Sequence, residues 1–222
     1  MVPFSFAEQE MRLVQGRALF WPRESALLVA DLHLEKGSSF ACFGQMIPPY
    51  DSRETLERLA LALRETGARR VFCLGDSFHD AKGADRLEPH AAGMLAALTR
   101  AVDWVWITGN HDSAMAGVAA GEWLEESCVS GIHLRHEARA GEAGAEISGH
   151  FHPRLRIVAR GRRIARACAV STGHRLILPA YGAFTGGMDA AAPEIVAALQ
   201  PARVIDALTL SGNRLARFPV WR

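Results

Sequence analysis

The stretch that decides the fold is ALLVADLH, residues 26–33, in which five apolar residues run directly into Asp31 and His33. A short apolar run of this kind is typical of a β-strand buried on both faces. Asp31 and His33 are spaced i, i+2, so on an extended backbone their side chains lie on the same face. We therefore expect a buried strand that ends in two polar, chemically capable side chains.

Three further apolar runs end in polar residues of the same kinds. In open α/β sheets the carboxyl ends of the strands form the ligand crevice. Four strands with such endings therefore predict one shared site at a sheet edge. The further runs are RVFCL (70–74) before Gly75 and Asp76, WVWIT (104–108) before Gly109, Asn110, His111 and Asp112, and EIS (146–148) before Gly149, His150 and His152.

Helical patterns alternate with these strands. Residues 51–66 carry apolar side chains at helical spacing behind a D-x-x-E start, and Gly67 follows as a stop signal. A second helix is expected over residues 88–100, with Pro89 at its first position. Beyond residue 156, alternating stretches without a helical pattern indicate antiparallel sheet. The sequence predicts an α/β fold with a mixed sheet, or two packed sheets, and flanking helices.

The composition is that of an ordinary globular protein. The chain has 222 residues, 49% hydrophobic and 22% charged, and can bury a substantial core. A net charge of +1 argues against a strongly basic or acidic binding protein. Glu8 and Glu10 interrupt the apolar stretch that an export signal needs, and no apolar run is long enough to span a membrane. We expect a cytoplasmic protein with no membrane partner. No sequence feature marks a domain boundary or an oligomeric state.

The polar side chains after the strands are typical ligands of divalent metals. A lone D-x-H or G-D pair is usually an ordinary turn, but four such motifs in order point to a metal site. Asp, Asn and His offer oxygen and imidazole nitrogen without thiolate, which suits Mn, Fe or Zn. Six or seven such groups are too many for one tetrahedral centre. Two ions roughly 3.5–4 Å apart, sharing a carboxylate and a water, would use them all.

Taken together, the motifs Asp31-x-His33, Gly75-Asp76, Gly109 to Asp112 and Gly149-His150-x-His152 resemble those of the calcineurin-like metallophosphoesterases. The resemblance spans roughly residues 26–153. It implies a four-layer αββα sandwich with a dinuclear site at the sheet edge. Residues 1–222 are then expected to form a single metallophosphoesterase domain.

The resemblance also implies the metal ligands, with Asp76 as the bridge between two ions. One histidine ligand must lie between the third and fourth motifs, where the candidates are His133 and His136. In the family this ligand is often followed by Gly or Glu, which favours His136 before Glu137. The implied ligands are Asp31, His33, Asp76 and His152 for one ion, and Asp76, Asn110, His136 and His150 for the other.

His111 is expected to face the scissile phosphate as a general acid or charge stabiliser, and not to bind metal. General acid catalysis of this kind is worth about 10²–10⁴-fold. Asp112 and Asp80 are the acids expected to fix its tautomer. Many relatives carry an acid three residues after the bridging aspartate. Here that position is His79 and the acid follows one residue later, so either His79 or Asp80 is a candidate to support His111.

A narrower resemblance, over residues 20–41, 48–52, 75–80 and 175–189, is to the PdeM group of ligase-associated DNA damage response endonucleases. It implies Mn as the metal, with Fe or Zn as alternatives, and DNA as the phosphodiester substrate. It also implies a functional association with a DNA ligase and helicase system. Two ions lower the pKa of a water between them, so the expected reaction is phosphodiester hydrolysis by a metal-bridging hydroxide.

Seven arginines and no acidic residue lie between residues 147 and 188. Arg154 and Arg156, with Lys36 near the first motif, are candidate substrate contacts; the alternative is a solvated hairpin whose arginines pair with acids elsewhere. Arg135 and Arg139 are candidates for the same basic face.

Two other functions stay open. One is a phosphatase or pyrophosphatase acting on a small nucleotide-like phosphoester. It is disfavoured because no segment is long enough for the helical cap of LpxH-type hydrolases. The other is a non-catalytic scaffold, a class that typically lacks the histidine found here at position 111.

Overall fold

The computed structural model describes residues 1–112, 119–159 and 161–221, which form two seven-stranded sheets and a two-stranded hairpin. The strands of the first sheet follow chain order from β1 to β7. Strands β4, β5, β6 and β7 are parallel, and β1 to β4 are antiparallel to one another. The first sheet consists of β1 (Val2–Phe6), β2 (Gln9–Val14), β3 (Ala18–Trp21), β4 (Ala26–Ala30), β5 (Arg70–Leu74), β6 (Asp103–Ile107) and β7 (Glu122–Leu124).

The second sheet has the order β16-β15-β13-β14-β10-β9-β8. Its strand β10 is parallel to both neighbours, and the remaining pairs are antiparallel. The hairpin of β11 (Arg154–Ala159) and β12 (Arg162–Ala167) stands apart from it. The second sheet consists of β8 (Ser127–Val129), β9 (Ile132–Leu134), β10 (Ala145–Ser148), β13 (Ala169–Ser171), β14 (Arg175–Ile177), β15 (Ile205–Ser211) and β16 (Arg214–Trp221).

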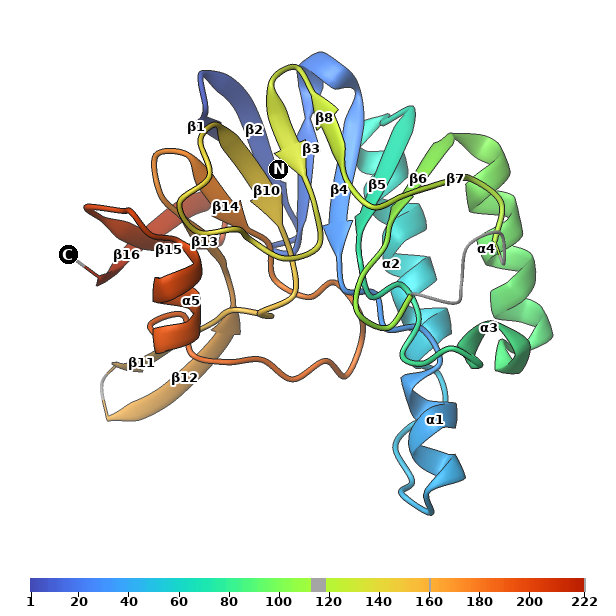
Figure 1. Ribbon diagram of the computed structural model, residues 1–222. Helices are drawn as coiled ribbons and strands as arrows, with labels where there is room; N and C mark the ends of the chain where they lie inside the picture. Colours follow the sequence, from blue (N-terminus) through green and yellow to red (C-terminus); the bar gives the residue numbers. More distant parts are fainter. Residues whose placement is uncertain (113–118, 160, 222) are drawn as a thin grey trace.

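Helices cover the outer faces of the two sheets, and α1 projects below them in Figure 1. No helix in the described part of the chain is both long and apolar enough to cross a membrane. The helices are η1 (Pro22–Glu24), α1 (Lys36–Cys42), α2 (Asp51–Thr66), α3 (Gly83–Arg86), α4 (Pro89–Ala101) and α5 (Pro193–Ala198).

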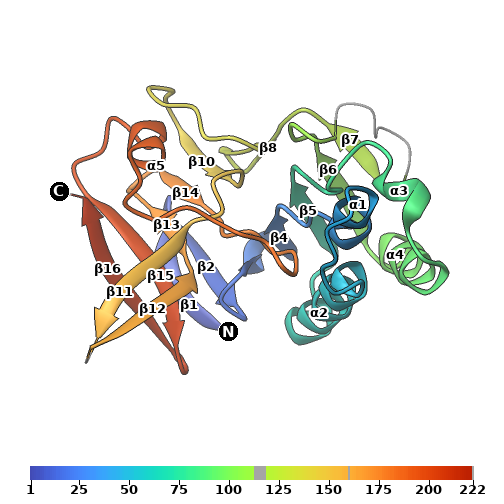
Figure 2. The same ribbon diagram turned by 90° about the horizontal axis from the view of Figure 1, so that it is seen from below.

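Three apolar cores separate four layers, as the view from below also shows (Figure 2). The central core lies between the two sheets and includes Trp21 and Phe72 from the first sheet and Leu176 from the second. A second core joins the outer face of the first sheet to α2 and α4, and a third joins the second sheet to α5 and the hairpin. The expected αββα sandwich is therefore confirmed, with α5 and the hairpin as its thin fourth layer.

The predicted central strands and the two predicted helices form within a residue or two of their expected bounds. The N-terminus of α2 is capped differently from the prediction. Helix α2 spans residues 51–66 as expected, yet Asp51 is its first helical residue and Tyr50 occupies the cap position. The Asp51 carboxylate instead accepts a hydrogen bond from Gly37 N at 3.0 Å. Helix α4 begins at Pro89, and Glu88 caps it by accepting from His90 N and Ala91 N. A tertiary partner therefore replaces the local capping role predicted for Asp51.

Candidate dinuclear metal site

The carboxyl ends of β4, β5, β6 and β10 meet at one edge of the two sheets. Parallel pairing aligns Ala30 with Leu74 and Leu74 with Ile107, so three strands of the first sheet end together. The second sheet reaches the same place, because His150 N donates to both carboxylate oxygens of Asp31 at 3.1 and 3.0 Å. The four motifs are therefore brought together as the strand ends predicted.

The chain turns sharply into this edge at the polar residues. Asp31, His33, Asp76, His150 and His152 all have positive φ, between 43° and 72°. The extended i, i+2 geometry expected for Asp31 and His33 is therefore wrong, and left-handed turns bring their side chains together instead. Such conformations cost about 1–3 kcal/mol each for residues other than glycine, and they are typical of functional sites.

One cluster of candidate metal ligands consists of Asp31, His33 and His152. The His33 Nε2 and His152 Nε2 atoms are 3.2 Å apart, and His152 Nε2 is 3.6 Å from Asp31 Oδ1. Two imidazole nitrogens about 2.1 Å from one ion, at an angle near 90–110°, lie roughly 3.0–3.4 Å apart. The separation of the two histidines therefore fits ligation of a single ion.

A second cluster consists of Asp76, His136 and His150. His136 Nε2 is 3.6 Å from Asp76 Oδ2 and 3.1 Å from His150 Nδ1. The same Asp76 Oδ2 atom is 3.8 Å from His33 Nε2 in the first cluster. Asp76 thus faces both clusters, which is the placement that a bridging carboxylate requires.

A hydrogen bond fixes the tautomer of His136 in the second cluster. His136 Nδ1 is 3.1 Å from the Leu74 carbonyl oxygen, to which it can only donate, so its Nε2 lone pair faces Asp76. His150 Nε2 faces Glu137 Oε1 at 3.7 Å, beyond hydrogen-bond distance, while its Nδ1 is directed at the cluster. Metal-bound histidines are typically oriented in this way by a carbonyl or carboxylate on the other ring nitrogen.

Burial keeps His33 in the form that binds metal. Its pKa is lowered to about 2, first by burial and then by the charges of the neighbouring His152, His79 and His111. A neutral imidazole offers its lone pair to a cation, whereas a protonated one cannot. The environment of His33 therefore favours ligation at neutral pH.

Two glycines of the motifs are required by close approach to the clusters. A Cβ atom on Gly109 would lie 2.3 Å from Asp76 N, and one on Gly75 would lie 2.1 Å from His136 Nδ1. Both separations are far below van der Waals contact with atoms of the site. Any larger residue would therefore displace a candidate ligand.

His133 and His136 were the two candidates for the histidine ligand between the third and fourth motifs. The structure brings His136 into the site. His136 is buried beside Asp76, while His133 lies on β9, paired with Glu146 across to β10. Asn110 also reaches the second cluster, with its Nδ2 atom 3.4 Å from His150 Nδ1. The amide flipped about its last bond would present oxygen to the same place.

His111 stands on the open side of the clusters. Its backbone N–H donates to Asp76 Oδ1 at 3.0 Å, and its Nε2 is 3.9 Å from Asp76 Oδ2. The His111 side chain is 46% exposed, in contrast to the buried candidate ligands Asp31, His33, Asp76 and His136. His79 lies alongside it, with the two rings nearly parallel and their centroids 5.9 Å apart. These two histidines therefore face the solvent from which a substrate would enter.

The roles predicted for Asp112 and Asp80 need correction. Asp112 is buried and accepts backbone hydrogen bonds from Ser77, Phe78 and Gly109, and burial raises its pKa. Asp80 accepts from Arg86 Nη2 at 2.6 Å, and this bond lowers the pKa of Asp80.

Both acids are thus occupied by partners other than the His111 ring. Asp112 joins the loop after β6 to the loop after β5, and Asp80 fixes the start of α3. Their positions in the sequence suggested a contact with the His111 ring, and the fold directs both carboxylates to other partners.

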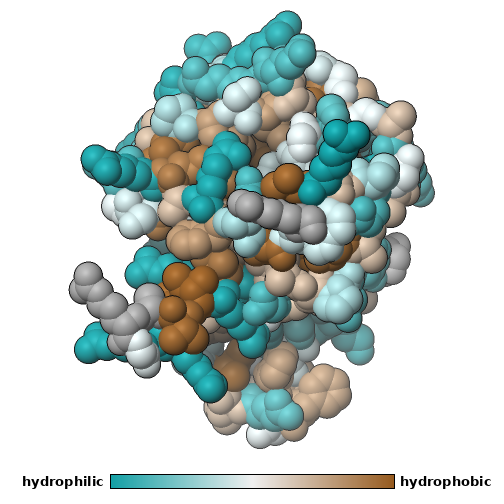
Figure 3. All heavy atoms as spheres, turned by 90° about the vertical axis from the view of Figure 1, so that its left-hand side faces the viewer, coloured by the Kyte–Doolittle hydropathy of each residue, from teal (hydrophilic) through white to brown (hydrophobic). Residues whose placement is uncertain are grey.

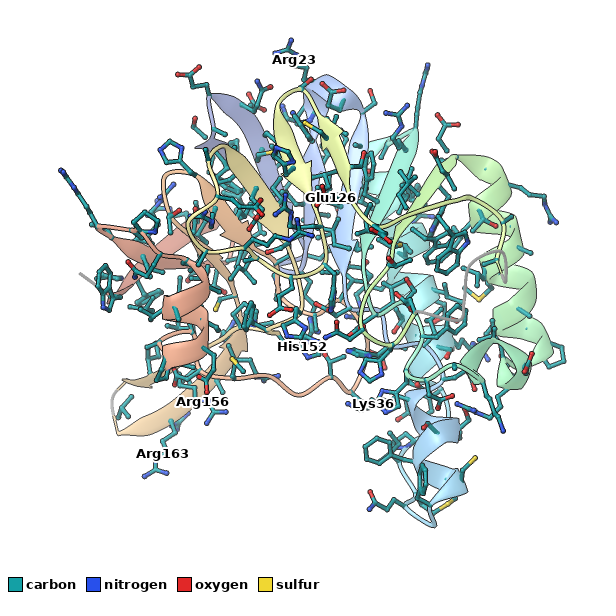
Figure 4. The ribbon with its side chains drawn as sticks, in the orientation of Figure 1. Arg23, Lys36, Glu126, His152, Arg156 and Arg163 are labelled. Carbon is teal, nitrogen blue, oxygen red and sulfur yellow. The ribbon has the colours of Figure 1, made fainter. Side chains whose placement is uncertain are left out.

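The three candidate substrate contacts lie at different places around the clusters. Lys36, at the start of α1, is close enough to His33 and His79 for its charge to lower the pKa of both. Arg154 lies beside Gly187, and Arg156 is exposed, 3.9 Å from Asp189. In Figure 4, His152 lies between Lys36 and Arg156. Lys36 is therefore placed at the site, and the two arginines at its margin.

The arginine-rich segment divides into buried and exposed members. Arg175 is buried and donates to the backbone carbonyls of Arg139, Glu142 and Gln200, with Glu146 3.9 Å away. The described arginines of the hairpin are exposed or half-buried. Figure 3, which faces the left-hand side of Figure 1, shows hydrophobic patches bordered by hydrophilic side chains. Arg160 lies outside the described residues.

The proposed contribution of Arg135 and Arg139 to a basic face is wrong. Arg135 is buried and pairs with Glu126, Glu142 and Glu146, and Arg139 pairs with the first two of these. Both arginines are therefore neutralised by acids from their own neighbourhood.

Comparison with known proteins gives a full-length structural likeness. No protein-family model and no curated protein matches the sequence. Among solved structures, the chain is similar to Pseudomonas putida nuclease MPE, with 27% identity, a TM-score of 0.73 and coverage of 97% of this chain and 98% of the nuclease. The likeness to Yfce, a phosphoesterase from E. coli, has 16% identity and a TM-score of 0.46, and covers 88% of this chain and 98% of Yfce.

The end-to-end match to the nuclease agrees with the four-layer fold and with two ligand clusters around one aspartate. The chain has the fold of the calcineurin-like metallophosphoesterases. Its full-length likeness to a nuclease indicates a metal-dependent hydrolase of phosphoric esters, and its two clusters fit a dinuclear centre.

Sequence reasoning assigned no role to two groups that face ring nitrogens of the candidate ligand histidines. They are the Glu137 carboxylate and the Leu74 carbonyl oxygen. For Glu137, the available signal was the presence of an acid directly after His136. A backbone carbonyl leaves no signal, because every residue carries one.

Proposed function

We propose that the protein hydrolyses phosphodiester bonds in DNA, with two Mn ions held by Asp31, His33, Asp76, Asn110, His136, His150 and His152. The observation that carries the proposal is Asp76 Oδ2, which lies 3.8 Å from His33 Nε2 and 3.6 Å from His136 Nε2. One carboxylate oxygen between two histidine-rich clusters is the arrangement that supports paired divalent ions.

When bound, the ion pair would supply Lewis acidity and a water of lowered pKa close to the phosphorus atom. The residues of this chain would position the ligand loops, supply a proton and bind the phosphate. Asp31 and Asp76 each accept a backbone hydrogen bond from the loop opposite, which holds the two ligand loops in register. His111, on the open side, would hold a proton for the departing oxygen, and Lys36 would hold a phosphate oxygen at the rim.

DNA as the substrate is supported by two observations. The full-length structural neighbour at 27% identity is a nuclease. Lys36 and the arginines of the β11–β12 hairpin place positive charge on either side of the clusters in the view of Figure 4, as binding of a polyphosphate chain requires. The proposal includes a role beside a DNA ligase and helicase system in repair, on the resemblance to the ligase-associated endonucleases.

The test compares a nitrophenyl phosphodiester, its monoester and single-stranded DNA, each with added Mn and with chelator. Hydrolysis of both diesters that depends on Mn supports the proposal. Equal rates with and without chelator would contradict a metal mechanism, and activity on the monoester alone would contradict the nuclease function. His133→Ala is a matched control for His136→Ala, because only the second should lose Mn and turnover.

A further inference from the structure

Two aromatic side chains from distant parts of the sequence meet at the surface of the molecule. The Tyr50 and Phe184 ring centroids are 5.6 Å apart with an interplanar angle of 65°. Tyr50 is 52% exposed and Phe184 is 42% exposed. An aromatic pair that is partly ordered by its own contact and still open to solvent offers ring faces to a ligand.

The backbone beneath Phe184 is tied directly to the metal clusters. Residues 182–187, which we call the rim loop, begin where Gly182 N donates to the Asp31 carbonyl at 3.2 Å. They end where Gly187 lies so close to the His152 carbonyl that a Cβ atom would be 2.1 Å from it. The loop therefore runs from one candidate ligand of the first cluster to another.

Further contacts hold the aromatic pair in a fixed place on this loop. Ala183 N donates to Thr55 Oγ1 of α2 at 2.9 Å, and Thr185 Oγ1 donates to Gly182 O at 3.0 Å. Figure 2 shows the segment between β14 and α5 reaching α2. Phe184 itself has φ of 55°, a left-handed conformation that is rare for a bulky residue and that aims its ring toward Tyr50. These contacts therefore hold the loop that carries Phe184 in place at the rim.

The rim near the pair also carries positive charge. Lys36 lies near Phe40, with its Nζ 5.6 Å from the ring centroid, and near His33 and His79 of the site. Asp51, the residue after Tyr50, accepts a backbone hydrogen bond from Gly37, which joins the start of α2 to the start of α1. Aromatic faces next to a cation at a phosphate-cleaving centre match the chemistry of a nucleotide, whose base stacks while its phosphate pairs with the cation.

We propose that Tyr50 and Phe184 form a nucleobase-stacking subsite, on which an unpaired base next to the scissile phosphate rests. The proposal rests on the proposed function, because it places this base beside the same two clusters. In a duplex both faces of a base are covered by its neighbours, so the subsite takes bases from single-stranded nucleic acid. Stacking on an aromatic side chain typically changes affinity by about 5- to 150-fold per base.

The test measures binding and cleavage separately. The probes are a fluorescent single-stranded 10-mer and the same 10-mer with abasic sites on both sides of the cleaved phosphate. Anisotropy in chelator gives dissociation constants without turnover, and KM and kcat are then measured with Mn. Phe43→Ala is the matched control, since Phe43 is an even more exposed aromatic, at 82%, that follows α1 and is not part of the pair.

Tyr50→Ala and Phe184→Leu should each weaken binding of the normal 10-mer about tenfold, and Tyr50→Phe should restore it. Neither substitution should weaken binding of the abasic 10-mer by more than about twofold, because the stacking partner is already missing. Phe43→Ala should leave both constants unchanged. With Mn, KM should rise in the two variants while kcat on a small methyl nitrophenyl diester stays within about twofold.

Equal losses on the normal and the abasic 10-mer would overturn the subsite. So would Tyr50-dependent binding to phosphatidylglycerol vesicles with no effect on the 10-mer, since the pair would then be a membrane contact. If the small diester is not hydrolysed with Mn, the proposed function fails. The anisotropy arm still reports on stacking in that case, so the two failures are distinguishable.

Discussion

The metal clusters and the β11–β12 hairpin place charge in opposite surroundings. Asp31 and Asp76 are almost fully buried, and each carboxylate receives a backbone N–H from an opposing loop. Arg156 and Arg163 of the hairpin are exposed, on two strands that pair with each other outside the two large sheets. The clusters thus hold charge in a fixed arrangement, whereas the hairpin carries charge that can adapt to a ligand.

This difference separates the parts of the molecule that can set reaction rate from those that can set affinity. Fixed, buried groups stabilise a transition state without reorganising during the reaction. Exposed arginines interact with phosphates through solvent, and salt screens that interaction. Substitutions in the clusters should therefore act on metal content and kcat, and substitutions in the hairpin on KM and its salt dependence.

The largest effect is expected for Asp76→Ala, because one carboxylate faces both clusters. We expect loss of both ions and a fall in turnover of about 10⁴-fold or more, equivalent to roughly 5 kcal/mol. Metal content by mass spectrometry and diester hydrolysis measure the two effects. Asp206→Ala, on the distant strand β15, is the control. Full metal occupancy in Asp76→Ala would contradict the bridging role.

His111→Ala should lose about 10²–10⁴-fold in kcat and keep both ions, because His111 lies on the open side and is not needed to hold metal. The loss should shrink for a substrate with a good leaving group, which needs little protonation. A matched loss of metal would show instead that His111 is a ligand. His79→Ala, next to it, should change kcat less.

Arg175→Met should destabilise the fold by about 2–3 kcal/mol, because it removes a buried donor to three backbone carbonyls and leaves Glu146 with Arg135 as its neighbouring cation. Urea unfolding with and without the substitution measures this. Arg156→Met is the matched control, and its exposed ion pair with Asp189 should be worth less than about 1 kcal/mol. Similar losses in both would remove the distinction between the two kinds of arginine.

The metal-free protein should lose stability as the pH falls below about 6.5. The pKa of His33 is lowered to about 2 in the fold, so between these values the unfolded chain binds a proton that the folded chain does not. The slope is about 1.4 kcal/mol per pH unit for this group. Urea midpoints at pH 7.5 and 5.0 in chelator, compared with His33→Gln, measure it. An unchanged slope in the variant would assign the effect to other groups.

The smallest effect is expected in the hairpin. Arg156→Ala and Arg163→Ala should each raise KM for single-stranded DNA a few-fold and lower the slope of log KM against log salt by about 1. Their kcat should not change. Arg23→Ala is the control, because Arg23 lies at the opposite end of the molecule (Figure 4). A salt slope that stays constant in both variants would remove the hairpin from the DNA path.

The sequence predicted the strands and ligand residues whose evidence is local. β4, β5 and β10 are apolar runs that end in polar motifs, and the helical period of residues 51–66 gave the bounds of α2. The N-terminal strands β1 to β3 and the pair β15–β16 were not predicted, because none of these runs ends in a polar motif like those that marked the central strands. The acids that neutralise Arg135 are close along the chain, but the sequence pattern does not show that β9 and β10 bring their carboxylates to the guanidinium. Asp112 shows the converse error, since its position beside His111 suggested a contact and the fold directs its carboxylate to the loop after β5.

The left-handed turns at positions 31, 33, 76, 150 and 152 have a consequence for directed evolution of this chain. Glycine adopts these dihedral angles more readily than any residue with a side chain. A screen for heat resistance in metal-free buffer should therefore accumulate Gly at the three histidine positions, whereas the backbone hydrogen bonds that Asp31 and Asp76 accept favour keeping both acids. Each gain in heat resistance would delete one side chain of the two clusters, so activity and robustness are opposed at the same residues.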